Sequence, residues 1–238
     1  MIRLYGKNQI LERLKVYPET IKKIICNQSV NNKVIKELAL RNNIAHIALP
    51  DKEFMSISKN VNDQGVIAET QEFLYHDLQQ ILQLPDENKI TLIALSNITD
   101  PQNLGSILRT SACFGRFALI IPKHRSVSIN ETVLKVACGG ENYIPVIQVT
   151  NLIPVLKQVK DAGYWVAGTV VDEGENIADF KFQFPLCLVI GSEDKGIRPG
   201  VIAHLDFKVT LPMPGARLSL NAAVATAIFC YEVTRQRR

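Results

Sequence analysis

The chain has 238 residues, a length that accommodates one large domain or two small ones. Its composition, 47% hydrophobic and 21% charged, is typical of a globular protein and excludes disordered, collagenous and coiled-coil chains. No run of residues approaches the roughly 18 consecutive apolar positions of a membrane span, and the first residues lack a secretory apolar core. We therefore expect a soluble, cytoplasmic protein without a membrane partner.

The five cysteines are scattered along the chain and never form a C-x-x-C pair; they are Cys26, Cys113, Cys138, Cys187 and Cys230. This pattern indicates neither a disulfide framework nor a zinc site, and the four histidines also lack ligand spacing. We predict no metal, and we expect the thiols to be small buried groups in a reducing cytoplasm.

Charge is distributed unevenly over the first hundred residues. Residues 1–50 carry nine Lys or Arg and three acids, whereas residues 51–100 carry three and nine. The basic segment favours a polyanion electrostatically, and nucleic acid is the first candidate. The alternative, that these cations are the solvated faces of two helices, stays open on charge alone.

The first part of the chain reads as a small α/β unit. Periodicity predicts a helix over 7–16, an apolar run over 20–26, a helix over 31–41, and strands over 46–49 and 66–69. Pro85, with the acidic and amide residues around it at 82–90, marks a boundary. We therefore predict a first domain over 1–78, a linker over 79–89 and a second domain over 90–238.

The second domain alternates β-rich runs with helical segments. The runs occupy 90–95, 117–122, 144–149, 164–169, 185–190 and 207–211, and an amphipathic helix over 221–235 follows them. Because the runs are apolar almost throughout, both faces of their sheet should be buried. This predicts a mostly parallel sheet covered by helices, with ligands beyond the carboxyl ends of its strands.

Three loops follow predicted strands and carry polar side chains. The first, at 97–109, opens a helix that Asn103 can cap, with Gly105 permitting close approach and Arg109 placed to complete a phosphate cradle. The second, at 191–196, has two glycines around Glu193, and the third, at 211–221, offers Ser219 and Asn221 as caps. An ordinary capped helix or a tight turn explains each loop alone; their coincidence favours one shared crevice.

In this order the three loops resemble the signature motifs of the SpoU (TrmH-type) 2′-O-ribose methyltransferases of the SPOUT superfamily. The resemblance covers residues 90–238, and the segment VACGGENYIP at 136–145 resembles another landmark of the family. Residues 1–78, with Tyr5-Gly6 and QGVIA at 64–68, resemble its RNA substrate-binding domain, which is similar to an L30e-type RNA binder. Among known activities, methylation of a guanosine ribose in large-subunit ribosomal RNA is the most similar.

The resemblance implies an α/β-knot fold, with a deep trefoil knot over 185–238, and a homodimer through the knot region and the C-terminal helix. It also implies S-adenosylmethionine as cofactor. The residues that would hold this cofactor are Thr169, Gly191, Gly196, Leu211, Met213 and Leu220.

The resemblance assigns roles to further side chains. Arg109 would activate the ribose hydroxyl, Asn103 would position Arg109 or the ribose, and Glu193 would orient the guanidinium or accept a hydrogen bond from substrate. Ser219 and Asn221 would complete the catalytic pocket. The implied RNA-binding residues are Arg13, Lys15, Lys22, Lys23, Arg109 and Asn142.

Three alternatives remain at this stage. A transfer RNA methyltransferase of the same family has the same motifs. A noncatalytic RNA-binding member of the superfamily is disfavoured because the five catalytic positions are intact. A nucleotide-binding α/β oxidoreductase is disfavoured because neither G-x-G-x-x-G nor a Walker loop is present.

Overall fold

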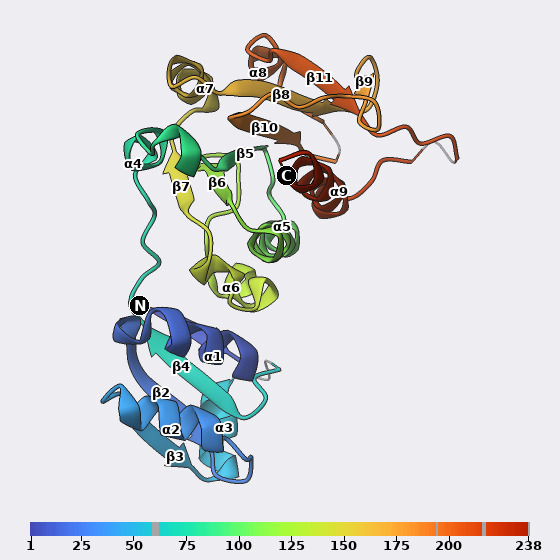
Figure 1. Ribbon diagram of the computed structural model, residues 1–238. Helices are drawn as coiled ribbons and strands as arrows, with labels where there is room; N and C mark the ends of the chain where they lie inside the picture. Colours follow the sequence, from blue (N-terminus) through green and yellow to red (C-terminus); the bar gives the residue numbers. More distant parts are fainter. Residues whose placement is uncertain (59–61, 194, 216–217, 238) are drawn as a thin grey trace.

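The computed structural model describes residues 1–58, 62–193, 195–215 and 218–237. Two α/β units follow one another along the chain and are joined by the extended segment 71–77 (Figure 1). Asp194 in the second predicted loop, and Ala216 and Arg217 in the third, lie outside the described residues.

The N-terminal unit is a four-stranded sheet with the order β1 (Ile2–Tyr5), β4 (Val66–Thr70), β2 (Ile21–Asn27), β3 (Ala45–Leu49). Only the β2–β3 pair is parallel. Helices α1 (Lys7–Val16) and α2 (Lys33–Arg41) pack on one face, and α3 (Asp51–Ser58) buries Phe54 against Ile25 and Ile67 on the other. The predicted helix over 7–16 is confirmed, whereas β1 and α3 were not predicted.

The second unit is a seven-stranded sheet in which every neighbouring pair is parallel, with the order β7-β6-β5-β10-β8-β11-β9. The strands are β5 (Thr91–Ser96), β6 (Phe117–Pro122), β7 (Val146–Val149), β8 (Trp165–Val170), β9 (Glu175–Asn176), β10 (Leu186–Gly191) and β11 (Phe207–Thr210). All six predicted strands are present, and the parallel arrangement is confirmed. Only the two-residue β9 was not predicted.

Helices cover both faces of this sheet, as its apolar strands require. One face carries α5 (Pro101–Phe114), α6 (Glu131–Ala137) and α9 (Ala222–Gln236), and the other carries α4 (Leu78–Leu82), α7 (Leu152–Asp161) and α8 (Pro199–Ile202). The helices α5 and α9 lie side by side (Figure 1). The five cysteines are free thiols; Cys26, Cys187 and Cys230 are buried, but Cys113 is exposed, contrary to expectation.

The predicted linker over 79–89 is placed too late in the chain. Within it lie most of α4, whose Leu78, Ile81 and Leu82 pack in the core of the second unit, and a short 3-10 turn, Asp86–Asn88. The polar cluster around Pro85 therefore marks the loop between α4 and β5. The chain has already entered the second unit at residue 78, because burial of the three α4 side chains holds that helix on the sheet.

The predicted cap of α5 is also wrong. Asp100 caps the helix, accepting a 2.9 Å hydrogen bond from the backbone N–H of Gln102, and Asn103 lies buried inside the first turn. Gly105, by contrast, permits the predicted close approach: a Cβ there would lie 2.5 Å from the Cβ of Val136 on α6. Local capping by Asp100 thus leaves the Asn103 amide available for contacts with distant loops.

The Gly105 contact yields a stability prediction. Gly105→Ala forces α5 and α6 apart and should lower the free energy of unfolding in urea by about 1–3 kcal/mol. Gly200→Ala in α8 is the matched control, because its added methyl meets only the flexible end of Ile153 at 3.3 Å. Equal stability of the two variants would contradict the close packing of α5 on α6.

Candidate active site

The three predicted loops meet at the carboxyl ends of the central strands. β10 lies between β5 and β8, and β8 pairs with β11, so the segments that follow β5, β10 and β11 emerge at the same edge of the sheet. Parallel sheets of this kind bind ligands at that edge. Hydrogen bonds join the three loops there, as predicted, but only the second and third loops line a cavity at this edge.

One carboxylate joins the three loops. Oε1 of Glu193 accepts hydrogen bonds of 2.9 Å from Nδ2 of Asn103 and from the backbone N–H of Ala222. Asn221 donates from Nδ2 to Oδ1 of Asn103 at 2.7 Å, and its own Oδ1 accepts from the N–H of Ala223 at 2.9 Å. The cap predicted for Asn221 is therefore confirmed. The negative carboxylate also lies at the positive end of the α9 dipole, which stabilises it there.

Steric constraints explain why the second loop has glycine at positions 191 and 196. A Cβ at Gly191 would collide with the backbone of Gly196, and Gly196 has a φ of +59°, in the left-handed region that favours glycine. Ser192 and Gly196 pair through both backbone groups, at 3.2 and 2.9 Å. This tight turn fixes where Glu193 points.

A cavity of about 320 Å³ lies beside this turn. All six residues predicted to hold a cofactor line it, namely Thr169, Gly191, Gly196, Leu211, Met213 and Leu220, and so do Glu193 and Ser219. Asn103 and Asn221 are not part of its lining. Asn103 bonds to Glu193, and Asn221 bonds to Asn103, so both contact the wall of the cavity without facing into it.

The cavity also includes charged residues that the sequence analysis missed. Asp172 and Glu173 follow β8, Lys208 lies on β11, and Lys195 lies in the second loop. The Nζ of Lys208 is 3.9 Å from a carboxylate oxygen of Glu173. The signal for the two acids was available, because they come directly after a buried strand at its carboxyl end.

Arg109 lies apart from this network. Its side chain is exposed on α5, and it lies eight positions after Pro101, so its Cα is about 12 Å along the helix axis from that of Pro101. The predicted cradle, in which Arg109 and the amino end of the helix hold one phosphate, is therefore wrong. Glu193 is engaged by Asn103 and Ala222, so its described contacts do not orient the Arg109 guanidinium.

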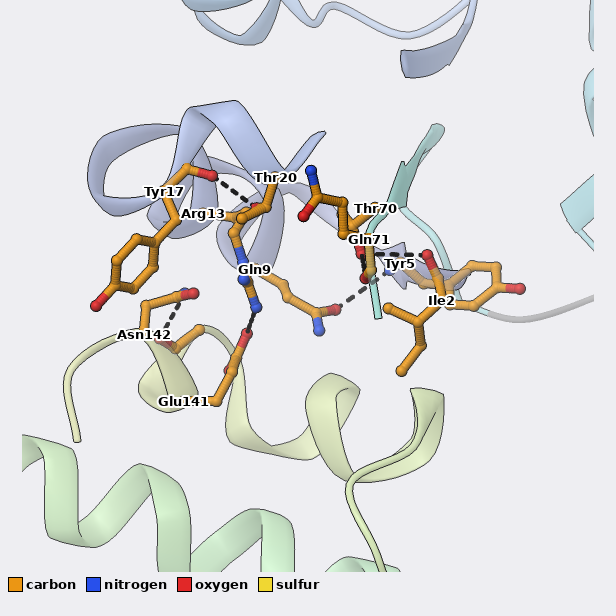
Figure 2. Close-up of polar contacts among 11 residues, drawn as sticks. Ile2, Tyr5, Gln9, Arg13, Tyr17, Thr20, Thr70, Gln71, Glu141 and Asn142 are labelled. Carbon is orange, nitrogen blue, oxygen red and sulfur yellow. Dashed lines mark hydrogen bonds and ion pairs between the residues drawn. The ribbon is translucent and has the colours of Figure 1, made fainter. Parts of the chain in front are cut away.

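The predicted RNA-binding residues differ in exposure. Lys22 is exposed, Lys15 pairs with Glu12 at 2.6 Å, and Lys23 pairs with Glu69 at 3.0 Å. Arg13 and Asn142 instead lie at the junction of the two units (Figure 2). There Arg13 contacts Glu141, and Asn142 is buried and donates to the carbonyl of Gly139 at 2.8 Å.

Within the described ranges, no helix is long and apolar enough to cross a membrane. Among the same residues, no group of three or more His, Cys, Asp or Glu side chains could hold a metal ion.

Comparison with known proteins assigns the two units to known domain types. Residues 90–231 match the SpoU rRNA Methylase family, and residues 3–76 match a domain described as RNA 2′-O ribose methyltransferase substrate binding. A Bacillus subtilis (strain 168) protein assigned to the TrmH family of tRNA/rRNA methyltransferases is 36% identical over 236 residues, covering 98% of this chain and 94% of the relative.

Solved structures have the same fold across both units. The SpoU methyltransferase AviRb from Streptomyces viridochromogenes, solved with AdoMet, has a TM-score of 0.83 at 24% identity, covering 99% of this chain and 90% of that one. An AdoMet-bound rRNA methyltransferase from Sinorhizobium meliloti has a TM-score of 0.80 at 20% identity, with coverage of 98% and 87%.

The fold and the site therefore define a two-domain protein of the RNA methyltransferase class. More particularly, the chain belongs to the SpoU family, in its TrmH-type branch.

The role of Asn221 as a cap gives a stability prediction. Asn221→Ala removes both the cap of α9 and the bond to Asn103, and should lower the free energy of unfolding by about 1 kcal/mol or more. Asn221→Ser retains a capping oxygen and should lose less, although it cannot reach Asn103. Thermal unfolding of both variants measures the difference; equal losses would mean that capping contributes nothing.

Proposed function

We propose that the protein transfers a methyl group from S-adenosylmethionine to a ribose 2′-hydroxyl of RNA. The observation that carries this proposal is the cavity at the carboxyl end of the sheet. The second and third loops and the segment after β8 line it, and Glu193 ties it to the first loop through Asn103. The SpoU family assignment and the substrate-binding match of the N-terminal unit support it.

The residues of the cavity fit this cofactor chemically. Leu211, Met213 and Leu220 offer apolar surface for an adenine ring. Lys195 and Lys208 are suited to the carboxylate of a methionine moiety, and Asp172 and Glu173 to its ammonium group. When bound, the cofactor supplies an electrophilic methyl group on a positively charged sulfur.

The protein's own contribution is alignment and charge stabilisation. In-line transfer requires donor and acceptor about 3–3.5 Å apart. The loops around Glu193 would fix the position of the methyl donor. A guanidinium donates hydrogen bonds and does not act as a base, so Arg109 is not assigned the role of accepting the hydroxyl proton. We infer that Arg109 orients a phosphate of the RNA and stabilises the developing alkoxide. Its exposure on α5 leaves it accessible to a large substrate.

Ribosomal RNA is the preferred substrate, with a guanosine of the large subunit as the specific proposal. The description of the matching family as rRNA methylases supports this choice. Transfer RNA is the second candidate, since the Bacillus relative is assigned to tRNA/rRNA methyltransferases. In the N-terminal unit, Lys15, Lys22 and Lys23 are the proposed phosphate contacts. A cytoplasmic location remains part of the proposal.

We also propose a homodimer whose interface includes α9 and the region that corresponds to the family's knot, residues 185–238. Val224, Ile228 and Tyr231 are exposed on α9 at spacings of four and three residues, which forms an apolar stripe along one side of the helix. We propose in addition that residues 185–238 form the trefoil knot of the family, to which the matching family model at 90–231 points.

Arg109→Ala is the first test of this mechanism. We expect loss of methyl transfer from labelled S-adenosylmethionine to unmodified RNA by at least about 100-fold, because the alkoxide loses its stabilising cation. Cofactor affinity, measured by calorimetry, should be unchanged, since Arg109 is not among the residues lining the cavity. An equal loss of transfer and cofactor binding would contradict the assigned role.

Offering ribosomal RNA and transfer RNA in parallel decides the substrate. Label at a single 2′-oxygen of ribosomal RNA is the expected result, and label in transfer RNA would favour the second candidate. Cofactor binding without transfer to naked RNA or to ribosomal particles would favour a noncatalytic RNA-binding protein.

A further inference from the structure

The two units meet at a junction formed by β1 and α1 on one side and by α6 and the 3-10 turn Gly140–Asn142, here the junction turn, on the other (Figure 2). Glu131, at the start of α6, accepts bonds from the N–H of Arg3 at 3.0 Å and from the Tyr5 hydroxyl at 3.4 Å. Farther along α1, Arg13 pairs with Glu141 at 3.3 Å. The Tyr143 hydroxyl, directly after the junction turn, also donates to Glu12 on α1. Polar contacts therefore hold the first unit against the second both at the start of α6 and at the junction turn.

The junction turn contacts both α1 and the helix that carries Arg109. Gly139 has a φ of +94°, and a Cβ there would lie 2.5 Å from the Cβ of Glu12. A Cβ at Gly140 would lie 2.9 Å from the Cα of Arg109. These approaches give the two glycines of the CGGENYIP landmark a physical role. They allow one short turn to contact the N-terminal unit and the backbone of Arg109 at once.

The Arg13–Glu141 pair is enclosed within this junction. The Glu141 side chain is 0% exposed and that of Arg13 is 11% exposed. Burial raises the pKa of Glu141, and the neighbouring Arg13 opposes that rise. The described contacts join one nitrogen to one oxygen, and Arg13 Nε and Glu141 Oε2 have no hydrogen-bond partner among the described residues. The Arg13–Glu141 contact therefore depends on opposite charge more than on bidentate hydrogen bonding.

We propose that Glu141 is a positioning residue for methyl transfer. By pairing with Arg13, it fixes α1 on the junction turn and so sets where RNA bound to the N-terminal unit presents its ribose to Arg109. This inference rests on the proposed function, and it assigns Arg13 to the junction in place of a direct contact with RNA. Glu141 touches neither RNA nor cofactor and acts through Arg13 and the junction turn.

The test measures kcat, the RNA dissociation constant, the cofactor dissociation constant and thermal stability for a set of full-length variants. Glu141→Gln keeps the shape of the side chain and removes its charge. The double variant Arg13→Glu with Glu141→Arg restores opposite charges in reversed order. Lys160→Gln is the matched control, because it breaks a 2.6 Å ion pair with Asp206 inside the second unit.

For Glu141→Gln we expect kcat to fall by about tenfold or more, since small misplacements of reacting groups are costly. The RNA and cofactor dissociation constants should stay within about twofold of wild type, because neither binding surface is altered. The reversed pair should recover at least part of kcat. Lys160→Gln should match wild type in all four quantities.

Three results would overturn the inference while leaving the proposed function intact. The first is an unchanged kcat in Glu141→Gln. The second is a variant in which kcat, cofactor affinity and melting temperature all fall together, and the third is tighter RNA binding in Glu141→Gln. The last would mean that Glu141 withholds Arg13 from RNA. An inactive wild-type protein with every RNA offered would instead refute the proposed function, and this inference with it.

Discussion

The candidate active site depends on one carboxylate oxygen that accepts two hydrogen bonds. Oε1 of Glu193 receives the side-chain amide of Asn103 from one loop and the first backbone N–H of α9 from another. A charged acceptor suits the amino end of a helix, where the dipole is positive. Without this carboxylate, the loops after β5, β10 and β11 would share an edge of the sheet but have no common anchor.

That anchor is possible only because of the strand order. β5, β10, β8 and β11 are neighbours in a parallel sheet, so loops separated by more than a hundred residues in sequence leave it on the same side. The glycines at 191 and 196 then fold the second loop back on itself, which presents Glu193 to α5 and α9. Sheet topology brings the loops together, and side-chain chemistry fixes their relative positions.

Much of this arrangement could be predicted from the sequence. Strands that are apolar throughout indicated a covered parallel sheet, and the rule for its carboxyl edge located the cavity. The prediction failed where two local signals competed or where packing is long-range. Asp100 and Asn103 are both good caps, and the sequence does not say which one the helix uses. Arg13 looked like a surface cation, but the docking of α1 on the junction turn buries it. The turn residues near Pro85 resembled a linker because the burial of α4 beside them depends on the distant sheet.

The central claim, that Glu193 organises the cofactor cavity by joining the loops, is tested most directly by calorimetric titration of S-adenosylmethionine in a double-mutant cycle. Asn103→Ala and Glu193→Ala should each weaken cofactor binding. The loss of affinity in the double variant should be clearly smaller than the sum of the two single losses, because both changes remove the Asn103–Glu193 bond, although Asn103→Ala also removes the bond to Asn221. Cofactor affinities that remain at the wild-type level, or losses that simply add, would contradict the account.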